Sequence, residues 1–150
     1  MLNRITPYAI LVGRVVLGIV FIAHGWQKLT EGGLSGTAQG FEAMGIPLPT
    51  VSAAFIIFVE LVGGAALIVG ALLPVFGVLI ALNMLGAIYF VHGENGFYNM
   101  GGGYEYVLSL AAFAIAIGFS GGGALAVDSL IPGLRASSGK NAGAQAGAAA

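Results

Sequence analysis

Long apolar stretches, separated by short polar segments, dominate the hydrophobic pattern of this chain. A helix needs roughly 20 residues to cross a ~30 Å hydrocarbon core at 1.5 Å per residue. The stretches are continuously apolar and do not alternate, which indicates helices and not barrel strands. The sequence therefore predicts an all-α integral membrane four-helix bundle, with spans at about 8–29, 51–72, 75–92 and 104–120.

Residues 51–92 are predicted to form a helical hairpin. A single helix of this length would be about twice as long as a bilayer accommodates. Gly70 and Pro74 lie near its middle, where they favour a tight turn. The first span is predicted to be a retained membrane helix and not a cleaved signal peptide, because its apolar run is too long and is interrupted by Arg14.

The polar connections and the cations set the expected orientation. Lys and Arg near span ends are enriched on the cytoplasmic side. The side of the termini carries Arg4, Arg135 and Lys140, whereas the opposite loops carry only Lys28. The chain is therefore predicted to be a multi-pass protein of a bacterial plasma membrane with both termini in the cytoplasm (N-in/C-in).

Three further segments are predicted outside the spans. The first outer loop, about 30–50, is expected to contain a short interfacial helix around Thr37–Met44. The second outer loop, about 93–103, is rich in Gly and polar residues. Residues 133–150 are poor in bulky apolar side chains and are predicted to be a disordered cytoplasmic tail after the single membrane domain at 1–132.

Composition supports the membrane class and excludes several chemistries. The chain is 58% hydrophobic and 7% charged, against about 25% charged residues in a soluble domain. It contains no cysteine, which excludes disulfides, thiolate chemistry, iron–sulfur ligation and Cys-based zinc sites. A net charge of −1 without basic clusters argues against nucleic-acid binding.

Two charges lie inside the predicted spans, where insertion costs at least ~2.5–3.5 kcal/mol. Arg14 would lie ~9 Å from one end of its span and Glu60 ~14 Å from the opposite end of its own. The two levels differ by under ~10 Å, so an Arg14–Glu60 ion pair is predicted. Such a pair would fix the register of the two helices. Alternatively, the Glu60 carboxylate would exchange protons or hold a ligand. Gly18 and Gly25 share the Arg14 face, which should point into the bundle.

A second polar group is predicted at the outer membrane edge. The candidate catalytic residues are His24, His92 and Glu105, and the candidate cofactor-binding residues are Lys28, Tyr98 and Tyr104. A histidine and a carboxylate at one edge could relay protons to or from a lipid-soluble redox carrier. Alternatively, these side chains reach toward headgroups, and the tyrosines form an interfacial aromatic belt.

Haem and metal binding are not expected in this chain. Two histidines on different helices could ligate haem in a bundle, but His92 lies at the very end of its span. Glu60 and Glu105 lie on different levels, which argues against a carboxylate-rich metal site. Asn83 is predicted to be a polar contact between helices.

Four sequence segments resemble the DoxX family of small four-span bacterial membrane proteins, over residues 8–131. They are RVVLGIVFIAHGWQKL (Arg14–Leu29), GIPLP (Gly45–Pro49), ELVGGAALIVG (Glu60–Gly70) and HGENGFYNMGGGYEY (His92–Tyr106). The last is the most specific, because composition alone seldom yields such a polar string at a membrane boundary. The tract GGGALAVDSL, with Asp128, resembles the closing tract of the family more loosely.

The resemblance implies a role in quinone-linked electron transfer. Family members resemble the small subunits of thiosulfate:quinone oxidoreductases, and actinobacterial relatives are linked to membrane oxidoreductase assemblies. This implies a quinone as the bound molecule and a partner oxidoreductase subunit that supplies the electron chemistry. Two alternatives stay open at this point: a non-catalytic membrane scaffold that docks a partner enzyme, and a small-molecule transporter enlarged by homo-oligomerisation.

Overall fold

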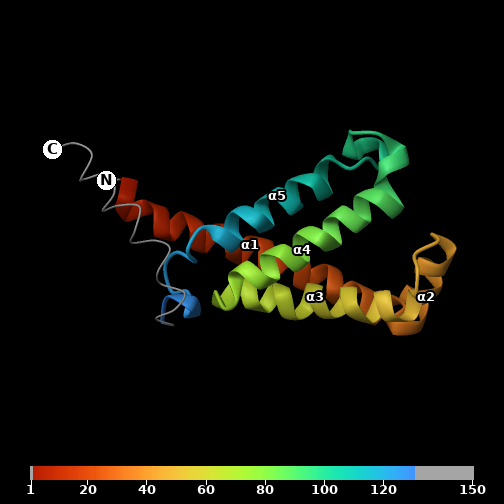
Figure 1. Cartoon of the computed structure of the whole chain (residues 1–150), viewed down its shortest axis with the longest axis horizontal. Coiled ribbons are helices and arrows are strands. Elements are labelled where there is room, and N and C mark those ends of the chain that lie inside the picture. The colour runs from red at the N-terminus through yellow and green to blue at the C-terminus, as the bar shows by residue number, and fades with distance from the viewer. Residues whose placement is uncertain (1, 131–150) are drawn as a thin grey trace.

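The computed structural model describes residues 2–130, which form helices joined by short turns (Figure 1). This confirms the predicted all-α fold. Its α-helices are α1 (Leu2–Glu31), α2 (Gly33–Ala43), α3 (Pro49–Val69), α4 (Leu73–Ala87) and α5 (Glu105–Phe119). The shorter turns are π-helical η1 (Ile88–His92) and the 3₁₀ turns η2 (Gly93–Asn95), η3 (Asn99–Gly101) and η4 (Val127–Leu130). The predicted tail at 133–150 lies outside the described residues.

The lengths and surfaces of the helices fit a bilayer. Three described segments are long and apolar enough to cross one: Arg4–Glu31, Pro49–Val69 and Leu73–Asn95. Helix α5 is apolar but shorter. Large apolar side chains on the outward faces, such as Val12, Phe58 and Phe119, are more than half exposed. So much exposed apolar surface is stable in lipid and not in water, so the bundle is an integral membrane protein.

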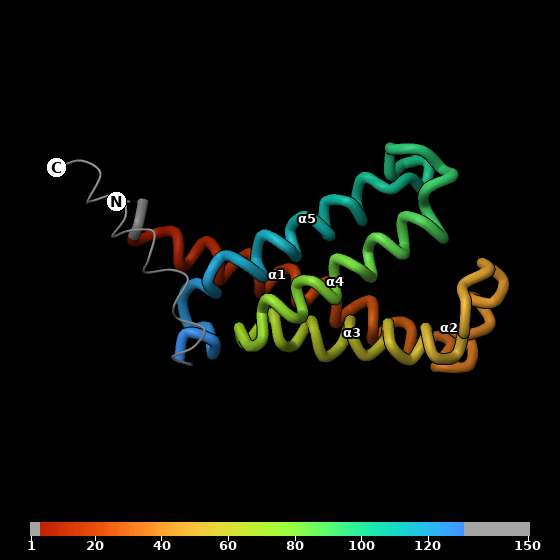
Figure 2. The backbone as a smooth tube through the Cα atoms, viewed as in Figure 1, coloured from red at the N-terminus to blue at the C-terminus, as the bar shows by residue number. Residues whose placement is uncertain are grey.

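The long helices form two antiparallel pairs, α1 with α3 and α4 with α5. The two pairs meet near the turn between α3 and α4 and diverge toward the opposite end of the molecule (Figure 2). Buried side chains from all four helices fill the core, among them Leu17, Val59, Ile80 and Ala114. Helix α2 folds back on the start of α3 and packs there through Phe41.

Glycines allow the helices of each pair to approach closely. A Cβ on Gly18 would lie 2.5 Å from the carbonyl oxygen of Gly64, and a Cβ on Gly64 would lie 2.7 Å from that of Gly18. Gly77 and Gly118 make the corresponding approach between α4 and α5. Close backbone contact through small residues is typical of helix packing in membranes. The prediction that the Gly18 face of α1 points into the bundle is confirmed.

A Gly18→Ala substitution is expected to destabilise the bundle by roughly 1–3 kcal/mol, because the new methyl group would overlap a backbone atom that cannot move aside. The control is Gly36→Ala in α2, where a Cβ would meet nothing within 4 Å. It should be neutral or stabilising, since alanine favours a helix over glycine by about 1 kcal/mol. Thermal unfolding of both variants in the same detergent measures the difference. Equal stabilities would contradict the close α1–α3 contact.

Arg14 is completely buried and binds the end of α3. Its Nη1 donates to the carbonyl of Leu67 at 3.0 Å and to that of Ile68, and its Nη2 donates to the carbonyl of Ala124 at 2.8 Å. The last carbonyls of a helix have no partner within it and lie at the negative end of the helix dipole. Arg14 therefore caps α3 and ties it to the segment that follows α5.

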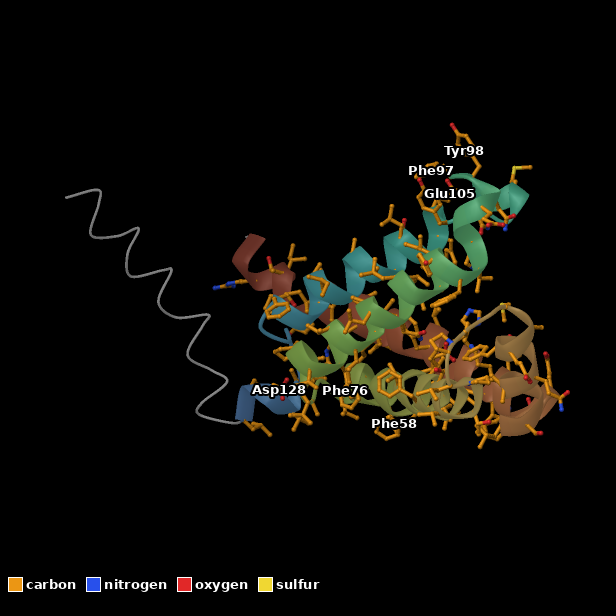
Figure 3. All side chains as sticks on the ribbon, turned by 45° about the vertical axis from the view of Figure 1, so that its right-hand side comes forward. Phe58, Phe76, Phe97, Tyr98, Glu105 and Asp128 are labelled. Atoms are coloured by element: carbon orange, nitrogen blue, oxygen red, sulfur yellow. The ribbon has the colours of Figure 1, made fainter. Side chains whose placement is uncertain are left out.

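Asp128 caps the opposite kind of helix end, the N-terminus of α4 (Figure 3). Its two carboxylate oxygens accept hydrogen bonds from the amides of Leu72 and Leu73, at 2.8 and 2.9 Å. Its own amide donates to the carbonyl of Gly70 at 2.8 Å. A carboxylate is favourable at a helix N-terminus, and Leu72 also needs support because its φ of 52° is left-handed. Asp128 and Arg14 together fasten the α3–α4 turn.

The predicted Arg14–Glu60 ion pair is wrong. Arg14 lies level with the last turn of α3, whereas Glu60 lies level with Gly25 of α1. These two levels are about 16 Å apart along α1 at 1.5 Å per residue. The prediction assumed that the ends of α1 and α3 are flush, but the first turns of α1 extend past α3. There the Pro7 carbonyl accepts a hydrogen bond from the amide of Ala124 at 2.9 Å.

Candidate functional site

A cavity of about 590 Å³ lies where the two helix pairs diverge. Its walls come from α1, α3, α4, η1 and α5 and from the segment that joins α2 to α3, and they are mostly apolar. The polar side chains that line it are His24, Lys28, Ser52, Glu60, Asn83, His92 and Tyr106. A concave, mostly apolar space of several hundred Å³ with a few polar groups is typical of a small-molecule site.

The charged centre of this cavity is the pair formed by Lys28 and Glu60. Lys28 Nζ donates to both carboxylate oxygens of Glu60, at 2.9 Å to Oε1 and 2.8 Å to Oε2. Asn83 Nδ2 donates to the same Oε1 at 3.4 Å. The Glu60 residue is 4% exposed, and Lys28 is half-buried. A nearly buried carboxylate thus faces the cavity with its charge balanced by one lysine.

Glycine on α1 brings this pair together. Lys28 lies in the last turn of α1, and Glu60 lies in the middle of α3. Between them the two helices approach at Gly25, where a Cβ would lie 3.1 Å from the Cβ of Glu60. The absence of a side chain at Gly25 therefore leaves room for the Glu60 stem beneath Lys28.

His92 reaches the cavity from the π-helical turn η1, which ends α4. Wide π turns inside or at the end of α-helices are frequent at functional sites. His92 Nδ1 lies 2.7 Å from the carbonyl oxygen of Gly102. Because a carbonyl can only accept, Nδ1 carries the hydrogen, and Nε2 of the neutral ring is the nitrogen free to accept from a ligand.

The remaining predicted residues lie in the loop between η1 and α5 and at the start of α5, and they do not line the cavity. Phe97, Tyr98 and Glu105 lie together at the far end of α5 (Figure 3). Glu105 Oε1 accepts a hydrogen bond from the amide of Asn99 at 2.7 Å. The Phe97 ring makes edge-to-face contacts with Tyr98 and with Tyr104. These contacts join the loop to the start of α5.

The structure therefore divides the predicted outer cluster. It brings His24, Lys28 and His92 to one cavity and leaves Tyr98 in the loop and Tyr104 and Glu105 at the start of α5. The carboxylate that lines the cavity is Glu60, where the prediction had Glu105. The tyrosine that lines it is Tyr106, where the prediction had Tyr98 and Tyr104. Asn83, predicted as a contact between helices, does bind Glu60 on α3, and it also lines the cavity. These roles depend on which residues of neighbouring helices lie at the same level, and the sequence alone does not show this.

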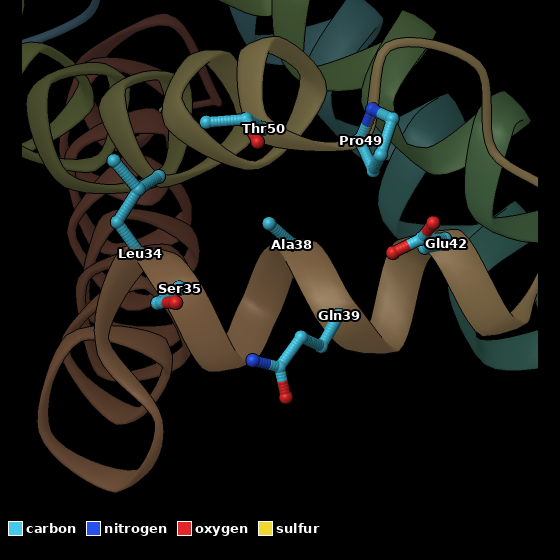
Figure 4. A pocket seen from close by; sticks show the side chains of 7 residues that line it. All are labelled: Leu34, Ser35, Ala38, Gln39, Glu42, Pro49 and Thr50. Carbon is cyan, nitrogen blue, oxygen red and sulfur yellow. The ribbon is translucent and has the colours of Figure 1, made fainter.

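A second depression lies between α2 and the start of α3 (Figure 4). It measures about 340 Å³, and its lining carries one ionisable side chain, Glu42. The neighbouring residues are small or uncharged, such as Ser35 and Thr50. The Lys28–Glu60 cavity is larger and carries the buried charges, so it is the candidate functional site.

Comparison with protein families gives a match to the DoxX family over residues 9–93. This region contains both charges of the cavity, Lys28 and Glu60, and also Arg14. No solved structure matches the chain with significance.

Individual relatives extend the similarity beyond that region. The chain is 34% identical to a Bacillus subtilis protein named "Putative oxidoreductase CatD", over 87% of this chain and 92% of the relative. It is 30% identical to the "Inner membrane protein YqjF" of Escherichia coli, over 87% of this chain and 97% of the relative. A Haemophilus influenzae protein without an assigned role is 32% identical over 85% of this chain.

Proposed function

The chain belongs to the DoxX family of membrane proteins, and on that basis we propose that it is a quinone-associated subunit of a bacterial membrane oxidoreductase assembly. The observation that carries the proposal is the cavity between the helix pairs, with its apolar walls and the Lys28–Glu60 pair. The B. subtilis relative, which is named "Putative oxidoreductase CatD", is consistent with an oxidoreductase role.

The polar groups of the cavity match the chemistry of a quinone headgroup. An ammonium group has three hydrogens, and Lys28 uses two bonds on Glu60, which leaves one for a quinone carbonyl. The reduced form, a quinol, has hydroxyl groups that need acceptors. Glu60 and the Nε2 of His92 are acceptors on the same cavity. The site therefore offers partners to both redox forms.

In this proposal the electrons come from a partner subunit. Reduction of a quinone to a quinol takes two electrons and two protons, which end on the two ring oxygens. The chain has no cysteine and so cannot hold a thiolate-ligated redox centre of its own. In the proposed assembly the partner delivers the electrons, while Lys28, Glu60 and the two histidines of the cavity, His24 and His92, bind the headgroup and exchange protons with it.

Replacing His24 by Leu is expected to weaken quinone binding about 3- to 10-fold, which corresponds to one hydrogen bond. The matched control is Gln27→Leu, because Gln27 is exposed on the same helix but does not line the cavity. Equilibrium titration of the purified protein in nanodiscs with decylubiquinone measures both. If the wild-type protein binds no quinone, the proposed function is wrong; if both variants bind like the wild type, His24 has no part in it.

A further inference from the structure

The rim of the cavity lies at the depth of the hydrocarbon. Phe55 of α3 and Leu82 of α4 both line the cavity, and they are 49% and 57% exposed. Phe55 is about 9 Å from the start of α3, and Leu82 is about 13 Å from the start of α4, at 1.5 Å per residue. Both side chains therefore belong to the interior of their spans and not to a polar loop, so the surface they expose faces lipid tails.

The helices α3 and α4 separate at this rim. Nearer the turn they are in contact, because a Cβ on Gly63 would lie 3.0 Å from the ring of Phe76 and 3.4 Å from Ile80. At Gly86, which also lines the cavity, a Cβ would meet nothing within 4 Å. Figure 1 shows the same divergence of the two helices away from their turn. The hydrogen bond from Asn83 to Glu60 still joins the two helices, and beyond it, toward Gly86, they stand apart around the cavity.

The charged pair of this space is withdrawn from the surface, unlike the rim. Lys28 of α1 is half-buried, and Glu60 of α3 is almost completely buried, with hydrogen bonds from Lys28 and from Asn83 of α4. The cavity thus combines a buried carboxylate and its lysine with an exposed apolar rim. This combination suits a molecule with one polar head and one apolar tail, with the head at Lys28 and Glu60 and the tail toward the lipid.

We infer that the cavity opens sideways into the bilayer between α3 and α4, and that its ligand keeps an apolar tail in the hydrocarbon while its head occupies the cavity. This inference rests on the proposed quinone function and adds the class of quinone, a lipid-soluble one with a long tail. Phe55 and Leu82 flank the opening, and Gly86 keeps it free of side chains.

The dependence of affinity on tail length tests the bound geometry. Two probes share one headgroup: 2,3-dimethoxy-5-methyl-1,4-benzoquinone without a tail, and decylubiquinone with a ten-carbon tail. Binding to the protein in nanodiscs is expressed relative to the mole fraction of each probe in the bilayer. If the tail stays in lipid, the two affinities agree within about tenfold. If the tail has to leave the lipid, affinity falls about fourfold for each methylene group.

Filling the opening tests its position. A Gly86→Phe substitution is expected to weaken decylubiquinone binding at least tenfold while the protein keeps its helical circular dichroism. Gly36→Phe in α2 is the matched control, because it also has open space around it and does not line the cavity. Leu82→Trp, on the exposed rim, is a second variant that should slow ligand entry without disturbing the core.

The possible results distinguish a failure of the lateral opening from a failure of the proposed quinone function. If both probes bind but the tailed one is weaker by several orders of magnitude, the lateral opening is wrong and the quinone function stands. An unchanged affinity in Gly86→Phe together with an unchanged rate of ligand entry in Leu82→Trp also overturns the lateral opening. If neither probe binds the wild-type protein, the proposed function itself fails.

Discussion

Replacing Arg14 by Met is expected to lower the free energy of unfolding by roughly 2–4 kcal/mol, because the α3 carbonyls that it binds would be left buried without a donor, at about 1–3 kcal/mol each. The same change removes the cost of burying a charge, so the net loss is smaller than the sum of its hydrogen bonds. Unfolding in mixed detergent micelles, followed by far-UV circular dichroism, gives the difference directly.

The control for Arg14→Met is Arg4→Met in the same helix. Arg4 is exposed, so this substitution should change stability by less than about 0.5 kcal/mol. Arg14→Lys should recover only part of the loss, since an ammonium group lacks the planar fork that reaches carbonyls of two segments. If Arg14→Met is as stable as the wild type, the contacts of Arg14 only balance the cost of its burial.

The apolar helices and the fold class could be predicted because each depends on local sequence; against four predicted spans, three described segments are long enough to cross a membrane, and α5 is shorter. Continuous apolar runs indicate spanning helices, and the break at Gly70–Pro74 coincides with the observed turn between α3 and α4. Helix α2 contains most of the predicted short helix, begins earlier, at Gly33, and ends at Ala43. The predicted N-in/C-in orientation stays a prediction, since no part of the described structure distinguishes the two sides of a membrane.

The partners of the charged residues could not be predicted, because they depend on how far the helices are shifted along one another. The sequence identified Arg14, Lys28 and Glu60 as unusual, and all three are now seen in buried or half-buried polar contacts. It did not reveal that Gly18 meets Gly64 and thereby sets the shift between α1 and α3. This shift places Lys28, and not Arg14, beside Glu60.

The roles of the loop residues depend on long-range contacts in the same way. Glu105 carries a charge at a membrane edge, which fits either proton chemistry or a structural contact. The hydrogen bond from the amide of Asn99 gives it a structural contact. Asp128 shows the opposite case: it lies in a weakly specific tract, and yet it caps α4 because the chain after α5 returns to the α3–α4 turn.

The second large effect concerns the charged pair of the cavity. Lys28→Met is expected to destabilise the protein by roughly 3–5 kcal/mol, because it leaves the nearly buried Glu60 carboxylate without its cation. Glu31→Gln is the control. Glu31 accepts only an exposed hydrogen bond from Gln27 at the same end of α1, so its loss should cost less than about 0.5 kcal/mol.

The double variant Lys28→Met/Glu60→Gln separates a structural role of this pair from a binding role. With both charges removed no uncompensated carboxylate remains, so most of the stability lost in Lys28→Met should return. The cavity would nevertheless lack its ammonium donor and its carboxylate acceptor, so quinone binding should stay at least tenfold weaker than in the wild type. A double variant that is stable and binds decylubiquinone like the wild type would show that the pair only holds α1 and α3 together. The headgroup would then have to bind to His24 and His92, on the other walls of the cavity.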